Sequence, residues 1–296
     1  MDVSVIIVAY NSATTLAPCL ASVRTQSGVA FEVILVDNAS TDGTLAIARS
    51  LQTGARVIEN PENIGFGRAN NQGFLASCGR FLYLLNPDAE TAHPDVLSRL
   101  CQAMEGHPCW GLAGTRIVGA DGTSEAEPAT AYPGQRYVSR DFSGLPGRIA
   151  WILGASMLVR REVYAALGGF DPGFFLYSEE TDFCLRLREA GHEIGFVDEV
   201  TVRHIGGGSE MGRDPYEVTR RKMAGLHRFW QKHYSAEDAA RLVRRDLHRA
   251  RFRMLWYGFS KYFQSAAAPS RKYLEYRAIW EASKGFLAAK TAGSPR

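Results

Sequence analysis

Three carboxylates occupy four consecutive positions in the segment SEETDF, residues 178–183. Glu179, Glu180 and Asp182 are close enough along the chain to raise one another's affinity for a proton, because like charges disfavour ionisation. A carboxylate whose pKa is raised toward neutrality can act as a general base and remove the proton of an alcohol. The structural alternative is that these residues open a helix, since the helix dipole stabilises acidic side chains in the first turn.

A second group of residues suggests a hard cation. The apolar run FLYLL stops at Asn86-Pro87-Asp88, and because proline cannot donate to a sheet ladder, we expect the strand to end there. An Asp oxygen can bind Mg²⁺ or Mn²⁺ whose other ligands are water and substrate phosphates. A single carboxylate binds such an ion weakly, so we expect His204 to be its partner. The alternatives are that Asp88 is a turn residue and that His204 is structural.

A third carboxylate, Asp37, ends the apolar run FEVILVD and precedes NASTDG. It could accept the imide N–H of a uracil or thymine base, or it could cap a turn or a helix. The glycine-rich turns of a dinucleotide-binding fold and of a P-loop are absent, because the turn after the first apolar run reads YNSATT. A nucleotide would therefore be held by other groups.

The elements that position these residues follow from the apolar pattern. Continuous apolar runs of strand length, separated by helical patterns, predict a parallel sheet covered on both faces. The predicted strands are residues 3–10, 31–37, 55–60 and 81–86, with a strand-like segment at 192–205, and the predicted helices are 14–26, 42–53, 66–78 and one from Glu162. Ligands of such open sheets bind at the carboxyl ends of the strands. Polar residues converge at that edge: Tyr10, Asn11, Asp37, Asn38, Asn86 and Asp88.

The two parts of the chain differ in charge. Residues 1–202 contain 14 Arg, no Lys and 23 acidic residues, a net charge of −9, whereas residues 203–296 contain 20 Lys or Arg and 8 acidic residues, a net charge of +12. The basic part is predicted to be helical, and residues 120–148 are predicted to form an irregular loop. Five cysteines without a CxxC pair favour reduced thiols and a cytoplasmic protein, and give no sign of a zinc cluster.

Six segments occur in a fixed order: VSVIIVAYN, ILVDNASTDGT, NPENIGFGRANNQG, LLNPDAE, GASMLVRREVYAALGGFDPGFFLYSEETDFCLRLREAG and VRHIGGGS. Together they resemble a family 2 glycosyltransferase with the GT-A fold, of the bacterial rhamnosyltransferase-like branch. The resemblance implies an α/β fold with an open, mixed, mostly parallel sheet and helices on both faces. It covers about residues 3–208 and implies a glycosyltransferase domain at 1–208, with a nucleotide-binding half (1–90) and an acceptor half (91–208). Residues 209–296 would be a basic helical extension.

The resemblance also implies roles for individual residues. The metal motif of this fold is usually Asp-x-Asp; here Asn86 takes the first position, so Asp88 would hold Mg²⁺ or Mn²⁺ together with His204. The family's base lies in a Glu-Asp-x-Asp pattern, and by this comparison Glu180 is the base and Asp182 the second choice. The nucleotide would contact Ala9, Tyr10, Asn11, Asp37, Asn38, Gly65, Arg68, Asn86 and Asp88. The donor sugar or acceptor would face Trp151, Gly154, Ala155 and Tyr177.

The implied reaction is an inverting, metal-dependent transfer of a sugar to a hydroxyl of a cell-surface glycan or polyprenyl-linked acceptor. L-rhamnose from dTDP-L-rhamnose is the favoured donor; a UDP-linked galactofuranose or hexose, or nucleotide-sugar binding without transfer, are the alternatives. We expect a cytoplasmic protein, which would lie at the inner face of the membrane if its basic tail binds lipid.

The basic tail has two interpretations. It could bind an anionic membrane surface, or it could be a packing arm that forms a homo-oligomer; nucleic acid is not an expected partner. The aromatic residues expected at a lipid interface are Trp256, Tyr257, Phe259, Tyr262 and Phe263.

Overall fold

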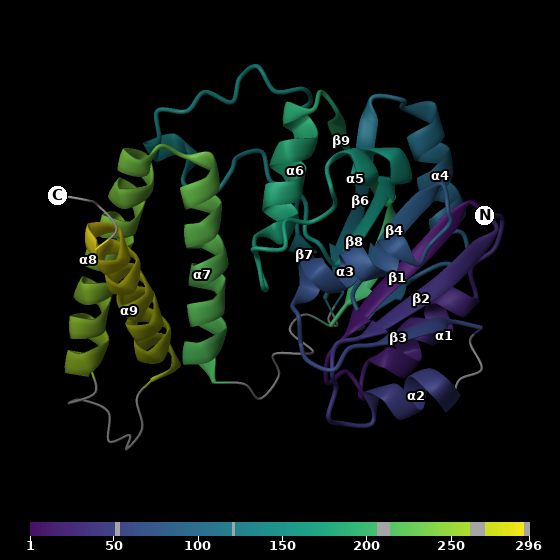
Figure 1. Cartoon of the computed structure of the whole chain (residues 1–296), viewed down its shortest axis with the longest axis horizontal. Coiled ribbons are helices and arrows are strands. Elements are labelled where there is room, and N and C mark those ends of the chain that lie inside the picture. Colours follow the sequence, from purple (N-terminus) through teal and green to yellow (C-terminus); the bar gives the residue numbers. More distant parts are fainter. Residues whose placement is uncertain (51–53, 120–121, 206–213, 261–269, 293–296) are drawn as a thin grey trace. The chain divides into compact units, whose positions relative to one another are not determined.

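The computed structural model describes residues 1–50, 54–119, 122–205, 214–260 and 270–292 (Figure 1). The chain divides into two compact units. The first unit contains residues 1–132, 143–175 and 179–211, and the second contains 133–142, 176–178 and 212–296.

A mixed sheet forms the centre of the first unit, with nine strands over the described residues. In chain order they are β1 (Val3–Ala9), β2 (Phe31–Asp37), β3 (Arg56–Glu59), β4 (Phe81–Leu85), β5 (Ala89–Thr91), β6 (Trp110–Val118), β7 (Ser124–Ala126), β8 (Ser156–Arg160) and β9 (Glu193–His204). Their order across the sheet is β3-β2-β1-β4-β8-β6-β9-β5, with β7 paired to β6. The strands from β3 to β4 are parallel, while β8 is antiparallel to both β4 and β6. The predicted α/β fold with a mixed sheet is therefore confirmed.

Helices cover the sheet: α1 (Leu16–Arg24), α2 (Thr44–Ser50), α3 (Phe66–Leu75), α4 (Val96–Gly106), α5 (Arg161–Ala166) and α6 (Glu179–Glu189). Every residue of β1 is buried. Successive side chains of the strand enter different cores, since Ile7 packs in a cluster with Leu35 while Ile6 packs in a cluster with Leu84. Each fully buried side chain of this size contributes roughly 1.5–3 kcal/mol. Burial on both faces explains why the strand sequences show no alternation of polar and apolar residues.

The registers of the strands determine where the predicted site residues leave the sheet. In the parallel part, Ala9 pairs with Asp37, so the polar residues that follow β1 and β2 leave the sheet at the same level. At the other end of the sheet, the short β5 is antiparallel to β9 and Ala89 pairs with His204. The positions just beyond the strands are thus fixed by backbone ladders.

The segment predicted as an irregular loop, 120–148, contains β7 and a short 3₁₀ helix, Gln135–Tyr137. Its residues 133–142 belong to the second unit, which the sequence did not predict. The backbone carbonyl of Pro133 accepts hydrogen bonds from Trp230 Nε1 at 2.9 Å and from the Tyr234 hydroxyl at 2.8 Å. The predicted domain boundary at residues 208–209 lies outside the described residues.

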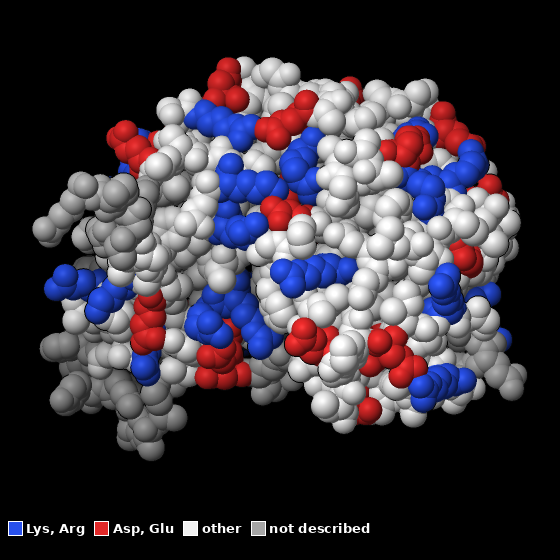
Figure 2. Space-filling view, in the orientation of Figure 1, with Lys and Arg blue, Asp and Glu red and all other residues white. Residues whose placement is uncertain are grey.

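The second unit is otherwise helical, as predicted. It contains α7 (Pro215–His233), α8 (Ala236–Ser260) and α9 (Arg271–Ala292), and α9 packs against both α7 and α8. Ser235 Oγ accepts the backbone N–H of Asp238 at 3.0 Å and so caps α8. Lys and Arg side chains gather over α7 on the face shown in Figure 2. Among the described helices, none combines the length and apolar character that a membrane crossing needs.

Candidate active site

Asp88 and His204 lie side by side at the edge of the sheet. Asp88 immediately precedes β5 and His204 is the last residue of β9, so the ladder between these strands brings the two residues together. Asp88 Oδ1 is 3.2 Å from His204 Nε2, and the two side chains are 8% and 9% exposed. The backbone N–H of Ile205 donates to the Asp88 carbonyl at 3.0 Å and fixes the end of the ladder. The sequence predicted these two residues as partners, and the structure places them in contact.

The spacing of this pair fits a divalent cation with two protein ligands. Adjacent ligands of an octahedral Mg²⁺ or Mn²⁺ ion are about 3 Å apart, given metal–oxygen distances of about 2.1 Å. Asn86 Nδ2 lies 3.4 Å from the same His204 nitrogen. Over the described part of the chain there is no cluster of three or more His, Cys, Asp or Glu that could hold a metal. Water and substrate phosphates would therefore supply the remaining ligands, as is usual for ions that bind phosphates.

Asp37 lies at the carboxyl end of β2 and is 3% exposed. Its Oδ2 accepts the backbone N–H of Ser40 at 3.1 Å, whereas its Oδ1 is buried and has no hydrogen-bond partner. Leaving a buried charged acceptor unsatisfied costs free energy. A donor group on a ligand would satisfy this oxygen, which fits the predicted contact with a nucleobase.

The turns after β1 and β2 have a strained backbone. Asn11 has φ 52° and Ala39 has φ 64°, a backbone region that residues other than glycine rarely adopt. The Asn11 amide N–H donates to Ser40 Oγ at 2.9 Å, and its side-chain oxygen accepts the Thr41 N–H at 2.8 Å. These bonds connect the two turns where the nucleoside is predicted to bind. Such strain costs about 1–3 kcal/mol per residue and clusters at functional sites.

Asn38, predicted beside the nucleoside, has its side-chain amide engaged within the protein. Its Nδ2 donates to Asn63 Oδ1 at 2.9 Å, and its Oδ1 accepts from Asn60 Nδ2 and from the Ile64 N–H, each at 3.1 Å. These contacts order the loop between β3 and α3. The Asn38 side chain therefore supports the edge of the predicted site through contacts within the protein.

Gly65 and Arg68 connect this loop to the segment before α6. Gly65 has φ +90°, and a Cβ there would lie 2.4 Å from the Phe175 carbonyl oxygen, so only glycine fits. Arg68 Nε donates to the Pro172 carbonyl at 2.8 Å, while the side chain stays exposed. Their predicted contacts with a nucleotide stay predictions.

The three acidic residues of SEETDF do open a helix, α6, yet their environments differ. Glu179 is 3% exposed and its Oε2 has no hydrogen-bond partner. Burial, with the nearby charges of Glu180 and Asp182, raises the pKa of Glu179 well above its ordinary value. Asp182 is fully buried, and Glu180 is half-buried. Glu180 is therefore the acid of this turn that retains contact with solvent.

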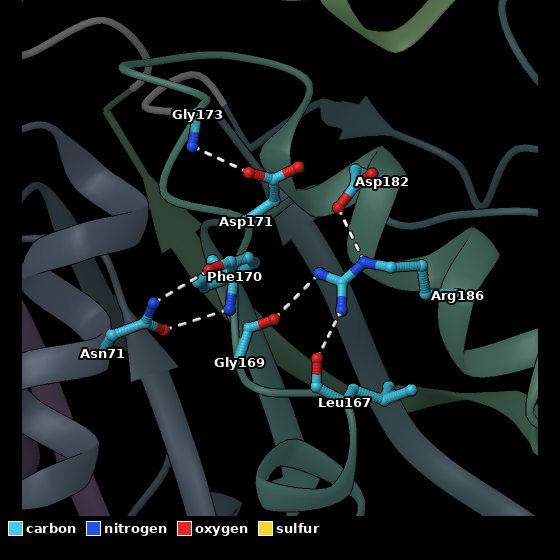
Figure 3. Close-up of polar contacts among 8 residues, drawn as sticks. All are labelled: Asn71, Leu167, Gly169, Phe170, Asp171, Gly173, Asp182 and Arg186. Carbon is cyan, nitrogen blue, oxygen red and sulfur yellow. Dashed lines mark hydrogen bonds and ion pairs between the residues drawn. The ribbon is translucent and has the colours of Figure 1, made fainter. Parts of the chain in front are cut away.

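Asp182 is held by an arginine that the sequence analysis did not single out (Figure 3). Arg186 Nε lies 2.8 Å from Asp182 Oδ2, and its other two nitrogens donate to the carbonyls of Leu167 and Gly169, each at 2.8 Å. Asn71 binds both backbone groups of the residue after Gly169. The spacing of Asp and Arg four residues apart on a helix was the signal that could have revealed the pair. Asp182 thus fixes the helix that carries Glu180.

A short series of contacts connects Glu180 to the predicted metal ligands. A Cβ on Gly154 would lie 3.4 Å from the Glu180 Cβ. The next residue, Ala155, accepts the Asn86 N–H at 3.0 Å, and Asn86 is the neighbour of His204 described above. Gly154, Ala155 and Asn86 thus lie between the predicted base and the predicted metal ligands, and the common site that these residues would form stays a prediction.

The remaining predicted sugar contacts are less direct. Trp151 is half-buried and donates through Nε1 to the Ala131 carbonyl at 3.2 Å. Ala155 is only 1% exposed and its carbonyl accepts the Asn86 N–H, so a direct contact between Ala155 and a ligand stays a prediction. Tyr177 belongs to the second unit, where its ring lies 5.0 Å from Lys222 Nζ. Tyr177 and Ser178 have φ values of 72° and 68°, which is a strained entry to α6.

Residues 4–168 match the sequence model of the family described as Glycosyl transferase family 2. The chain belongs to glycosyl transferase family 2. It is 28% identical over 244 residues to N-acetylglucosaminyl-diphospho-decaprenol L-rhamnosyltransferase of Mycobacterium tuberculosis, a match covering 71% of this chain and 78% of the relative. The O-antigen chain rhamnosyltransferase WbaN of Salmonella anatum is 26% identical over 58% of this chain and 56% of its own length. The predicted family and enzyme class are confirmed.

Solved glycosyltransferase structures show the same fold. The mannosyltransferase PcManGT of Pyrobaculum calidifontis, in complex with GDP-Man and Mn²⁺, aligns with a TM-score of 0.57 at 17% identity over 99% of this chain and 76% of that one. TarS 1-349 of S. aureus in complex with UDP aligns with a TM-score of 0.59 at 15% identity over 98% and 92% of the two chains. The first unit of this family 2 glycosyltransferase therefore has the GT-A fold.

Proposed function

We propose that this glycosyltransferase transfers L-rhamnose from dTDP-L-rhamnose to a hydroxyl group of a polyprenyl-linked or cell-surface glycan, with inversion at the anomeric carbon and with a divalent metal. The series of contacts from Glu180 through Gly154, Ala155 and Asn86 to the Asp88–His204 pair carries this proposal. A base and a metal on one sheet edge are what the transfer of a sugar from a nucleoside diphosphate requires. The two rhamnosyltransferases among the relatives support the choice of sugar.

Glu180 acts as the general base in this proposal. It accepts the proton of the acceptor hydroxyl while that oxygen forms a bond to the anomeric carbon. The bond from this carbon to the diphosphate oxygen breaks on the opposite face, so the configuration inverts. Asp182 and Arg186 act as positioning residues, because their ion pair and the carbonyls that Arg186 binds fix the first turn of α6.

Asp88 and His204 would hold the metal, which, when bound, neutralises the charge that develops on the departing nucleoside diphosphate. Mg²⁺ takes mostly oxygen ligands. One imidazole nitrogen among the ligands therefore favours a transition ion such as Mn²⁺. We expect EDTA to abolish transfer and Mn²⁺ to restore it at lower concentration than Mg²⁺. Transfer that EDTA leaves unchanged would exclude the metal.

Asp37 would select a pyrimidine base. Its unpartnered Oδ1 can accept the imide N–H that thymine and uracil both carry. This contact alone does not separate dTDP from UDP donors. The identity of the donor is therefore the first thing to determine.

A thermal-shift screen tests the donor directly. dTDP-L-rhamnose is compared with UDP-galactofuranose and UDP-hexoses, with and without Mn²⁺. A donor at 100 times its Kd stabilises the folded state by about 2.7 kcal/mol, so we expect the largest rise in Tm with dTDP-L-rhamnose and Mn²⁺. A larger rise with a UDP-sugar would replace rhamnose in the proposal, and a rise without any transferred sugar would make the protein a binder.

The acceptor is tested in the second step. An N-acetylglucosaminyl-diphospho-polyprenol is the first choice, because the mycobacterial relative carries that compound in its name. We propose that the protein acts on it from the cytoplasmic face of the membrane. Mass spectrometry of the lipid product should show the addition of one deoxyhexose.

A further inference from the structure

Helix α8 presents an exposed apolar surface that the proposed transfer does not use. Phe252, Leu255 and Trp256 are 68%, 66% and 63% exposed. Their spacing, i, i+3 and i+4, places them together on one side of the helix. Other apolar residues of the same helix, Val243 and Ala250, are buried in the second unit. We call the three exposed residues, with the arginines described next, the α8 patch.

Arginines surround the three apolar side chains. Arg251 and Arg253 flank Phe252 in the sequence, and one turn or more toward the start of the helix the same exposed side carries Arg244, Arg245 and Arg249. The one acidic residue between positions 241 and 258 is Asp246, whose side chain is 14% exposed and pairs with Arg249. The α8 patch therefore combines exposed aromatic and aliphatic groups with positive charge.

The residues that the structure exposes on this surface differ from those that the sequence predicted. Tyr257 stacks on Tyr276 of α9, with ring centroids 5.8 Å apart and an angle of 16° between the planes. It is therefore part of the packing between α8 and α9. The side chains of Phe259, Tyr262 and Phe263 lie outside the described residues. Phe252 and Leu255, which the sequence analysis did not name, take their place.

We propose that the α8 patch docks the protein on the surface of an anionic lipid bilayer. Arginines near such a surface each contribute about 1 kcal/mol of attraction. Trp, Phe and Leu side chains add apolar burial at the boundary between head groups and acyl chains. Each component suits this partner, because the binding of a helix at a membrane interface increases with its buried apolar area and with its attraction to anionic lipid.

Charge also decides between this occupant and a second copy of the chain. A symmetric dimer through the α8 patch would bring the same patch of both subunits together. The arginines of one copy would then face the arginines of the other, with a single partly buried acid on each side to offset them. A nucleic acid would match the charge but would leave Leu255 without a suitable contact.

This inference deepens the proposed function, since a lipid-linked acceptor lies at such a surface. Its test needs neither donor nor acceptor, so the two proposals can fail separately. The full chain is sedimented with vesicles of phosphatidylcholine alone, or of phosphatidylcholine with phosphatidylglycerol, at about 0.1 M salt. We expect binding to the anionic vesicles that weakens as salt rises, and little binding to the neutral ones.

Two matched comparisons assign the binding to the patch. The triple variant F252S/L255S/W256S should bind anionic vesicles about tenfold or more weakly. The control L75S removes a lone hydrophobic side chain that is 81% exposed on α3 and should bind normally. The pair R251Q/R253Q should lower binding about tenfold or more. The control pair R271Q/R277Q removes the same charge from residues paired with Glu275 and Glu281 and should lower it less.

Several outcomes would overturn the proposal. These are equal binding to neutral and anionic vesicles, unchanged binding by the triple variant, and loss of binding in all variants alike. A dimer in light scattering that the triple variant converts to a monomer would assign the patch to a second copy. Binding to RNA in preference to anionic vesicles would assign it to nucleic acid. Unchanged Tm values of the variants confirm that the protein stays folded.

Discussion

The two groups of titratable residues in the candidate site are built in opposite ways. Asp88 and His204 are far apart in the sequence and are brought into contact by a backbone ladder. Glu179, Glu180 and Asp182 are neighbours in one helical turn, yet the first is buried with one oxygen unpartnered, the second is half-buried and the third is buried in an ion pair. The comparison shows that residues far apart in sequence can share one environment, whereas residues that are neighbours in sequence can have three different ones.

The variant Glu180→Gln tests whether Glu180 has a role that Glu179 and Asp182 lack. It keeps the size of the side chain and removes the base, so we expect turnover to fall by about 10²–10⁴-fold. The donor should bind as before, because the proposed nucleotide contacts do not include Glu180. Turnover is measured from released nucleoside diphosphate, and binding from the thermal shift. Near-normal turnover would show that Glu180 is not the base. Its partial exposure would then give it no catalytic role beyond those of its neighbours.

The variant Asp182→Ala should act mainly on stability. Removing one partner of a buried ion pair leaves Arg186 uncompensated, and this typically costs about 3–5 kcal/mol of unfolding free energy. The control is Asp95→Ala, which breaks an exposed pair with Arg99 at the same i, i+4 spacing and should cost under about 1 kcal/mol. Denaturant unfolding measures both. Equal effects would mean that the Asp182 pair gains nothing from burial.

The variant His204→Ala tests the pair at the sheet edge. We expect the Mn²⁺ concentration for half-maximal activity to rise by at least about 10–100-fold, the range typical for loss of an outer-shell partner, because this variant removes a proposed direct ligand. Turnover at saturating Mn²⁺ should recover in part, because Asp88 remains. Isothermal titration with Mn²⁺ and a nucleoside diphosphate gives an independent value. An unchanged Mn²⁺ requirement would show that the contact with Asp88 is structural.

The variant Glu179→Gln should have the smallest effect, visible in the pH dependence of stability. Because the folded state raises the pKa of Glu179 above its ordinary value of 4.5, the folded state holds this proton more tightly than the unfolded state does. The favourable contribution is complete below pH 4.5 and is lost as pH rises through the folded pKa. The glutamine variant lacks this loss, so its Tm should exceed that of the wild type by a few degrees near pH 7 and match it near pH 4. Parallel Tm curves would contradict a raised pKa of Glu179 in the folded state.

The sequence by itself determined the parallel part of the sheet and the strand β9, but it did not predict β5, β6, β7 or β8. The apolar runs of β1, β2 and β4 depend on burial on both faces, and Pro87 ends β4 through its missing donor, so both effects are readable from local residues. The contact between Asp88 and His204 was also expected, because a carboxylate that binds a metal needs a second ligand. The metal itself stays a prediction.

Tertiary structure decided the rest. It buried Glu179, paired Asp182 with Arg186, engaged the Asn38 side chain with the loop between β3 and α3 and placed residues 133–142 in the second unit. It also turned Tyr257 inward against α9 and left Phe252 and Leu255 exposed. The physical reason is that the pKa and accessibility of a side chain depend on the groups packed around it, and those groups come from distant parts of the chain. The local sequence therefore predicts which residues could form the site, and packing determines the environment of each of them.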